Sequence, residues 1–125
     1  MLIVFFSLGI ASLAQATNRT VEKTREAVEQ ASPDDWYTLA VNAEKCFRKK
    51  VNLKEAAEWL DTSLSIAERP YNLSLKGDYY KMNRLHQEAL RYYVKALDAI
   101  QHNPDSGVST ESVQRKIAEL KDSEG

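Results

Sequence analysis

The chain has 125 residues, 43% hydrophobic and 28% charged, a length that allows one modest core and no second domain. Its formal net charge of −1 and pI near 6.1 argue against a general affinity for nucleic acid, because phosphate binding needs a surplus of lysine and arginine. The single cysteine, Cys46, excludes an internal disulfide, and His86 and His102 have no cysteine or histidine at the spacing of a zinc site.

The N-terminal segment 1–16 differs in kind from the rest of the chain. It reads MLIVFFSLGIASLAQA, an uncharged apolar run that ends in Ala14-Gln15-Ala16, with small residues where signal peptidase requires them. The run is shorter than the roughly 20 apolar residues that cross a bilayer. We therefore expect an export signal at 1–16, with a mature chain that begins near Thr17 in the periplasm or outside the cell. No lysine or arginine precedes the run, so an uncleaved anchor and an ordinary buried helix stay open as alternatives.

The remainder of the chain is typical of helix throughout. A weakly amphipathic helix is expected at about 20–31. The motif Ser32-Pro33-Asp34-Asp35 then predicts a helix start, with Ser32 as the N-cap and proline at the first helical position. Breakers and turn residues delimit the later helices, which are expected at about 34–50, 52–67, 71–82, 86–101 and 109–121.

Part of this helical sequence repeats at a spacing of 33 residues. Glu55, Ala56, Trp59, Leu60 and Leu64 recur as Glu88, Ala89, Tyr92, Tyr93 and Leu97. A helical period of this length marks units that stack on one another, because none can bury its apolar face alone. Such a stack offers a binding surface rather than a reaction centre.

The second unit, residues 70–103, resembles a tetratricopeptide repeat. The small, aromatic and proline positions of that family match Gly77, Tyr80, Ala89, Tyr93, Ala96 and Asn103-Pro104. Residues 34–69 resemble a preceding repeat, but without a gap Glu44 stands where a small residue belongs. A four-residue shift of the first helix matches Trp36, Leu39, Ala40 and Ala43 instead, and a helix one turn longer than usual reconciles the two alignments.

The resemblance implies an all-α fold. Antiparallel helix pairs would stack as a short right-handed solenoid, with capping helices at about 20–31 and 109–121. The segment from Asn52-Leu53 to Glu58-Trp59 is also similar to the helical tail of some exported bacterial proteins of unknown function. This similarity implies a location outside the cytoplasm and implies no activity. By helical spacing, we expect five aromatic residues to pack in or near the core: Trp59, Tyr79, Tyr80, Tyr92 and Tyr93. We expect Cys46 to be buried as well.

In this family the first helix of each pair lines a concave groove, and the resemblance implies the partner-binding candidates. They are Val41, Lys45 and Arg48 from the first repeat and Tyr71, Ser74, Asp78 and Lys81 from the second. With Lys49, these residues predict a basic bias suited to an acidic or C-terminal carboxylate ligand, although charge runs are also typical of a solvated helix face. Chaperone-binding members have a lysine and an asparagine where this chain has Val41 and Lys45, which argues against recognition of chaperone tails.

The sequence favours binding over catalysis. It has no serine or cysteine nucleophile motif, no glycine-rich phosphate loop and no distinctive carboxylate pair, so we expect no enzyme, cofactor or metal and no stable membrane insertion of the mature chain. One hypothesis is an exported adaptor that binds a peptide or protein segment in its groove. The alternative is a structural subunit that self-associates or assembles end-to-end in a cell-envelope complex, with a flanking apolar stripe such as Val113, Ile117 and Leu120 left open.

Overall fold

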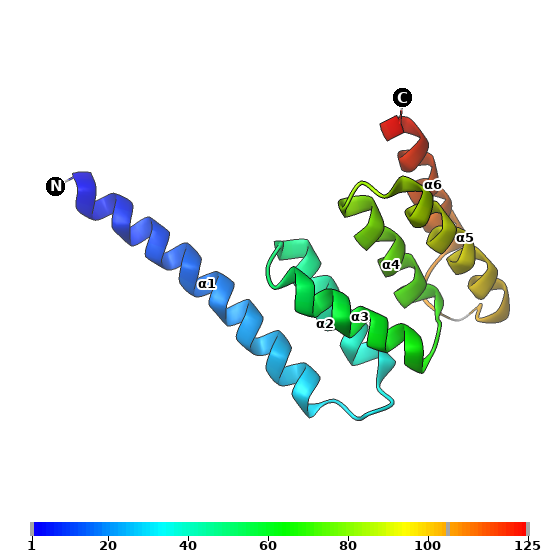
Figure 1. The fold of residues 1–125 in the computed structure, drawn as a ribbon, viewed down its shortest axis with the longest axis horizontal. Helices are drawn as coiled ribbons and strands as arrows, with labels where there is room; N and C mark the ends of the chain where they lie inside the picture. Colours follow the sequence, from blue (N-terminus) through cyan, green and yellow to red (C-terminus); the bar gives the residue numbers. More distant parts are fainter. Residues whose placement is uncertain (1, 105, 125) are drawn as a thin grey trace.

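The computed structural model describes residues 2–104 and 106–124, with the side chains of 15–104 and 106–123. These residues form six helices and no strand, which confirms the all-α class (Figure 1). Among the described residues, no helix combines the length and the apolar character needed to span a membrane. The helices are α1 (Leu2–Gln30), α2 (Trp36–Lys49), α3 (Leu53–Ile66), α4 (Pro70–Met82), α5 (His86–His102) and α6 (Thr110–Glu124).

Adjacent helices pack as antiparallel pairs. Short connections at 50–52 and 83–85 join α2 to α3 and α4 to α5, and α4 contacts both helices of the first pair (Figure 1). Helix α1 packs on α2, and α6 packs on α5. The predicted export signal lies partly outside the described residues, since neither Met1 nor the side chains of 2–14 are described. Its predicted cleavage point before Thr17 falls within α1, where Ala16 and Thr17 are exposed.

The start of α2 differs from the prediction. Ser32 is not the N-cap, because its carbonyl accepts a hydrogen bond from the Asp35 amide at 3.0 Å and closes a turn ahead of the helix. Asp35 is the cap instead, and its carboxylate accepts the Thr38 amide at 3.0 Å and the Thr38 hydroxyl at 2.7 Å. Since the turn takes Pro33 out of the helix, α2 has 14 residues against 13 for α4, and the predicted extra turn is absent.

Two apolar clusters form the core, one among α2, α3 and α4 and the other among α4, α5 and α6, and Leu64 packs against both. Helices α4 and α5 approach each other closely at Gly77, because a Cβ atom there would overlap the ring of the fully buried Tyr93. Ala89 is also fully buried, as is the predicted core residue Cys46. The other four aromatic residues of the predicted set are partly buried and pack against one cluster or the other: Trp59, Tyr79, Tyr80 and Tyr92.

The apolar stripe of α6 is buried within the chain. Val113 and Leu120 are 0% and 3% exposed, and Ile117 packs against the same cluster as they do. Ser109 caps this helix as predicted, with its hydroxyl accepting the Ser112 amide at 3.1 Å. The stripe is therefore not the open surface that end-to-end assembly would use.

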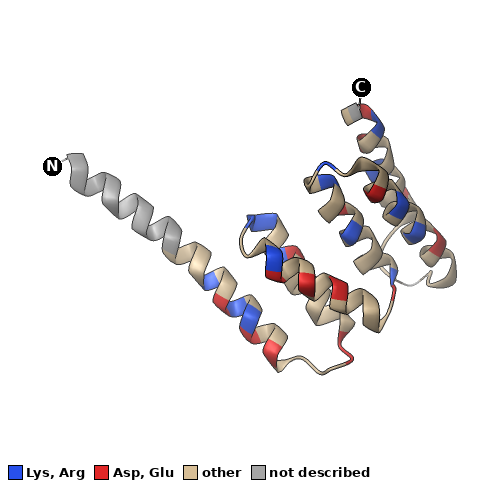
Figure 2. Ribbon diagram, viewed as in Figure 1, with Lys and Arg blue, Asp and Glu red and all other residues tan. Residues whose placement is uncertain are grey.

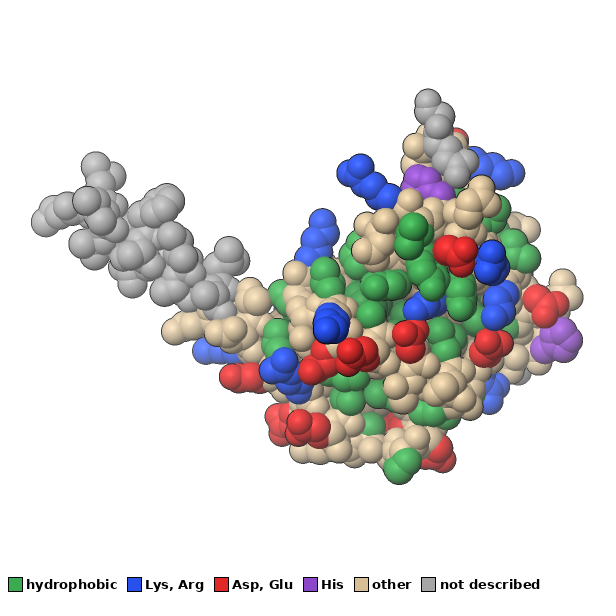
Figure 3. Space-filling view, in the orientation of Figure 1, with side chains coloured by type: hydrophobic (Ala, Val, Ile, Leu, Met, Phe, Trp, Pro, Cys, Tyr) green, Lys and Arg blue, Asp and Glu red, His purple; other side chains and the backbone are tan. Residues whose placement is uncertain are grey.

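Basic and acidic residues are interspersed along the helices rather than gathered by sign (Figure 2). The same mixture is visible on the face drawn in Figure 3, where apolar patches lie between the charges. The low net charge thus corresponds to a surface without a large patch of one sign on this face.

Candidate functional site

Three adjoining cavities follow α4 along its length. The first, of about 530 Å³, lies at the start of the helix, the second measures about 230 Å³, and the third, of about 310 Å³, lies at its end. Tyr71 lines both the first and the second, while Glu44, Leu75 and Asp78 line both the second and the third. The cavities therefore form one continuous groove, here called the α4 groove, which has α2 on one side and the 106–116 region on the other.

An ion-pair network fixes α6 beside the middle of the groove. Lys116 Nζ lies 2.8 Å from Asp78 Oδ2 and 3.2 Å from Ser74 Oγ. The Tyr93 hydroxyl donates to Asp78 Oδ1 at 2.7 Å, and burial, followed by this bond, raises the pKa of Tyr93 well above its ordinary value. Two of the predicted binding residues, Ser74 and Asp78, therefore also hold the fold together.

The charges around the groove compensate one another. Arg48 pairs with Glu44, and Lys81 pairs with Glu119 on α6 at 3.0 Å. Lys49 donates to Thr20 Oγ1 of α1 at 3.1 Å, away from the groove. These partners offset the basic bias that the sequence predicts.

The structure brings together four of the seven predicted site residues. Arg48, Tyr71, Ser74 and Asp78 line the α4 groove. Val41 is partly buried, Lys45 is exposed, and neither lines one of the three cavities, nor does Lys81. Sequence reasoning missed Lys116. It could have been found only by expecting α6 to lie next to α4 on the side opposite α2.

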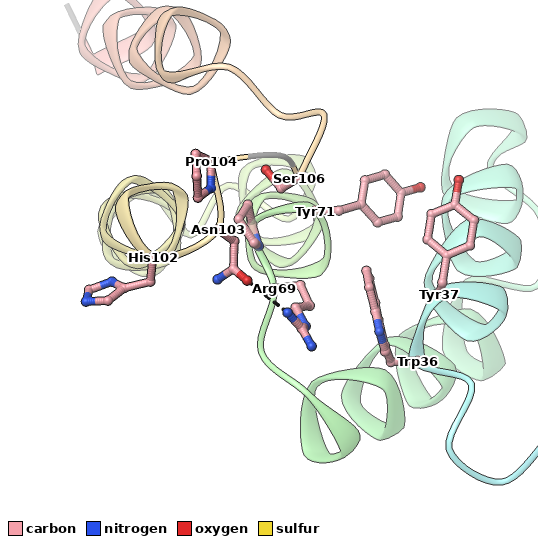
Figure 4. A pocket seen from close by; sticks show the side chains of 9 residues that line it. Trp36, Tyr37, Arg69, Tyr71, His102, Asn103, Pro104 and Ser106 are labelled. Carbon is pink, nitrogen blue, oxygen red and sulfur yellow. Dashed lines mark hydrogen bonds between the residues drawn. The ribbon is translucent and has the colours of Figure 1, made fainter.

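The first cavity is lined by three aromatic rings and is called the aromatic pocket below (Figure 4). The rings of Trp36 and Tyr37 meet edge to face with centroids 5.6 Å apart, and the Tyr37 and Tyr71 centroids are 5.7 Å apart. Tyr71 is partly buried, and burial, followed by the nearby Glu44 carboxylate, raises the pKa of its hydroxyl well above its ordinary value. Figure 4 shows the Tyr71 ring pointing from α4 towards Tyr37 on α2.

Arg69 lies on the opposite side of Trp36 from Tyr37 (Figure 4). Its guanidinium carbon is 5.9 Å from the centre of the Trp36 ring, and its Nη1 donates to Asn103 Oδ1 at 2.9 Å. The His102 ring points away from the cavity, with Nδ1 3.0 Å from the Asp98 carbonyl oxygen. Among the side chains that line the pocket, Arg69 is thus the basic group that faces the aromatic rings.

The connection between α5 and α6 supplies the remaining wall of the pocket. This connection, residues 103–109, is longer than the connection 67–69 between α3 and α4. Its residues Pro104 and Ser106 line the cavity. The Ser106 amide donates to the Asn103 carbonyl at 3.2 Å, and the Asn103 side chain donates to the Ala99 carbonyl at 3.1 Å. These bonds tie the pocket wall to the end of α5.

Sequence reasoning missed Trp36, Tyr37 and Arg69 as site residues. A signal was present, since Trp36 and Arg69 are 33 residues apart and so occupy equivalent positions of the two units. Stacked repeats place such positions next to each other. The described residues contain no cluster of histidine, cysteine and carboxylate side chains that could hold a metal ion.

No protein-family model matches the chain, and no curated protein or solved structure shows significant similarity to it.

Proposed function

We propose that this protein is a non-enzymatic scaffold that binds an extended segment of a protein partner in the α4 groove. The continuity of the three cavities along α4 carries the proposal. The 13 residues of α4 correspond to about 20 Å, which is the length of about six residues in extended conformation. A segment of this size suits recognition by a groove rather than by a flat interface.

The lining of the groove favours a partner segment of mixed polarity. Apolar side chains at both ends flank a middle that contains the Lys116–Asp78 ion pair. Large aromatic side chains in partly desolvated pockets supply most of the binding energy in many interfaces. We expect the aromatic pocket to anchor the segment and the rest of the groove to set its direction.

The helix arrangement proposed for this function is a short, right-handed, tetratricopeptide-like solenoid. The pairs α2–α3 and α4–α5 would be its two repeats, and α1 and α6 would cap its ends. Support comes from Ala56 and Ala89, which are 33 residues apart and both fully buried, and from the close contact of Gly77 with Tyr93. The buried stripe of α6 supports its role as a cap.

We also propose that the scaffold acts outside the cytoplasm, in the periplasm or as a secreted protein. The support is the apolar sequence of residues 1–16, with its small residues at Ala14 and Ala16. Mass spectrometry of the protein from its native host should give an N-terminus near Thr17. An intact N-terminus on cytosolic protein would contradict export.

The groove is tested with an array of random hexapeptides and a pair of matched variants. Ser112→Phe adds a ring to the middle of the groove, where Ser112 is one of the lining residues. Val94→Phe adds the same ring to α5 at a side chain that is 52% exposed and does not line the groove. We expect the parent and Val94→Phe to retain the same peptides and Ser112→Phe to lose about tenfold or more of that signal. Equal retention by all three proteins would contradict binding in the groove.

A further inference from the structure

We infer that the aromatic pocket receives a proline-containing segment in polyproline II conformation, with an acidic side chain next to the proline. This inference rests on the proposed peptide-binding function and specifies the chemistry of the peptide. It follows from the shape of the pocket, from the hydrogen-bonding groups left at its surface and from its charge.

The three rings form a surface suited to rigid, apolar groups. Tyr37 is 56% exposed, and its ring contacts both Trp36 and Tyr71, so the rings make a continuous apolar wall across α2 and α4. Polyproline segments dock on aromatic walls of this kind because their rings are flat and their backbone is already ordered before binding. The pocket volume of about 530 Å³ leaves room for more than one such ring.

Side chains that line the pocket offer several hydrogen-bond donors, and the Tyr37 and Tyr71 hydroxyls can also accept. The Asn103 amide is occupied, since its oxygen accepts from Arg69 and its nitrogen donates to a backbone carbonyl. The Ser106 hydroxyl accepts from the Val108 amide at 3.3 Å, which leaves its proton free to donate. The Trp36 indole can only donate, and Arg69 has further N–H groups beyond the one bound to Asn103.

A ligand that matches this lining brings acceptors and few donors. Proline has a backbone carbonyl and no N–H group, so a proline-rich segment satisfies donors without leaving a buried N–H of its own unpaired. Another residue packed against the three rings would bring an N–H group, for which the ring faces offer no acceptor apart from the tyrosine hydroxyls at their edges. Hydrogen bonding therefore favours proline at the rings.

Charge specifies the neighbouring residue. Within the described part of the chain, Arg69 has no carboxylate within ion-pair distance, whereas Arg48, Lys81 and Lys116 around the groove each have one. A guanidinium binds a carboxylate with two parallel hydrogen bonds when its donors are free. An acidic residue beside the proline would supply that partner.

The length of the groove sets the size of the probe. Polyproline II rises 3.1 Å per residue, so about six residues follow the roughly 20 Å of α4. The probes are therefore fluorescein-labelled EPPEPP, its proline-free counterpart EAAEAA and its basic counterpart KPPKPP, each with an amidated C-terminus. Binding is followed by fluorescence anisotropy of the label at low salt.

We expect the parent protein to bind EPPEPP at least tenfold more tightly than EAAEAA or KPPKPP. Tyr37→Ala should weaken EPPEPP binding about tenfold, because an exposed ring that anchors the proline is lost. A fourth probe, fluorescein-labelled QPPQPP with an amidated C-terminus, keeps the prolines and removes the carboxylates. Arg69→Gln should weaken EPPEPP about tenfold more than it weakens QPPQPP, because only EPPEPP loses a charged partner. Arg115→Gln, which removes an exposed arginine of α6 that does not line the groove, should change neither.

Trp36 provides a reporter inside the pocket. The chain has two tryptophans, so in a Trp59→Phe background the emission comes from Trp36 alone and should shift when EPPEPP binds. Equal binding of EPPEPP and EAAEAA, both blocked by Ser112→Phe, would overturn the proline inference and leave the groove function standing. Absence of binding to every probe, with peptides retained on the array, would also overturn this inference alone. A blank array together with unbound probes would overturn both.

Discussion

Replacing Gly77 by alanine tests the closest approach between α4 and α5. A Cβ atom at this position would lie 2.5 Å from Cδ1 and 3.0 Å from Cζ of Tyr93, well inside van der Waals contact. The ring has little freedom to move away, because Tyr93 is 0% exposed and its hydroxyl donates to Asp78 at 2.7 Å. The added methyl group must therefore displace a side chain that is held at both ends.

Two effects of opposite sign decide the result. Alanine is favoured over glycine within a helix by about 1 kcal/mol, whereas overpacking a tight core costs about 1–3 kcal/mol. Because the ring is anchored by its hydrogen bond, we take the upper part of that range and expect a net loss of about 1–2 kcal/mol. Helix propensity alone would predict the opposite sign.

The assay is urea unfolding followed by circular dichroism, with the free energy of unfolding obtained by linear extrapolation. The same change is then measured in a Tyr93→Leu background, since leucine occupies the equivalent position, Leu60, of the first pair. There Gly77→Ala should be neutral or stabilising, so the two sites should couple by about 1 kcal/mol or more. If Gly77→Ala left the free energy of unfolding unchanged or raised it, by the same amount with Tyr93 and with Leu at position 93, the tight contact between Gly77 and Tyr93 would be refuted.

Other predictions concern the cap, the buried lysine and the cysteine. Asp35→Ala should lower the unfolding temperature while Ser32→Ala leaves it nearly unchanged, and the reverse order would contradict the observed cap. The hydrogen bond from the Thr38 hydroxyl, followed by that from the Thr38 amide, lowers the pKa of Asp35. The stability that Asp35 contributes is therefore present above its unfolded pKa of about 4 and is lost as the pH falls through the folded pKa. Unfolding of the parent and Asp35→Ala across a pH series checks this. Asp61→Asn should cost about 1–3 kcal/mol in chemical unfolding, because it leaves the ammonium of Lys76, whose side chain is 8% exposed, without its carboxylate; an unchanged midpoint would contradict this. The Cys46 thiol should react with a thiol reagent only as fast as the protein unfolds, and rapid labelling of the native protein would show that it is not buried.

Features set by short-range patterns were predictable from the sequence. The 3.6-residue periodicity and the breakers placed the later helix boundaries within about two residues of α3, α4, α5 and α6 at most ends. The burial of Ala89 and Tyr93 follows from the same periodicity, because an apolar face must be covered. The periodicity left open whether the α6 stripe is covered within the chain.

Features that depend on competition between neighbouring groups or on long-range contacts were not predictable. Ser32, Asp34 and Asp35 could each cap α2. The sequence does not reveal that Ser32 closes a turn and leaves the role to Asp35. The basic bias expected for the groove is offset because carboxylates on other turns and on α6 meet Arg48 and Lys81. The aromatic pocket joins Trp36 to Arg69 across two helix pairs, a contact that exists only once the pairs have stacked.

The central claim is that a peptide lies along α4. Its most direct test is amide chemical-shift mapping of the isotope-labelled protein during titration with the hexapeptide that the array retains most strongly. We predict the largest shifts at Tyr71, Ser74 and Leu75 and on the facing sides of α2 and α6, with little change around Val94 on α5. Largest shifts on α1 or around Val94, with the α4 amides unmoved, would contradict binding in the groove.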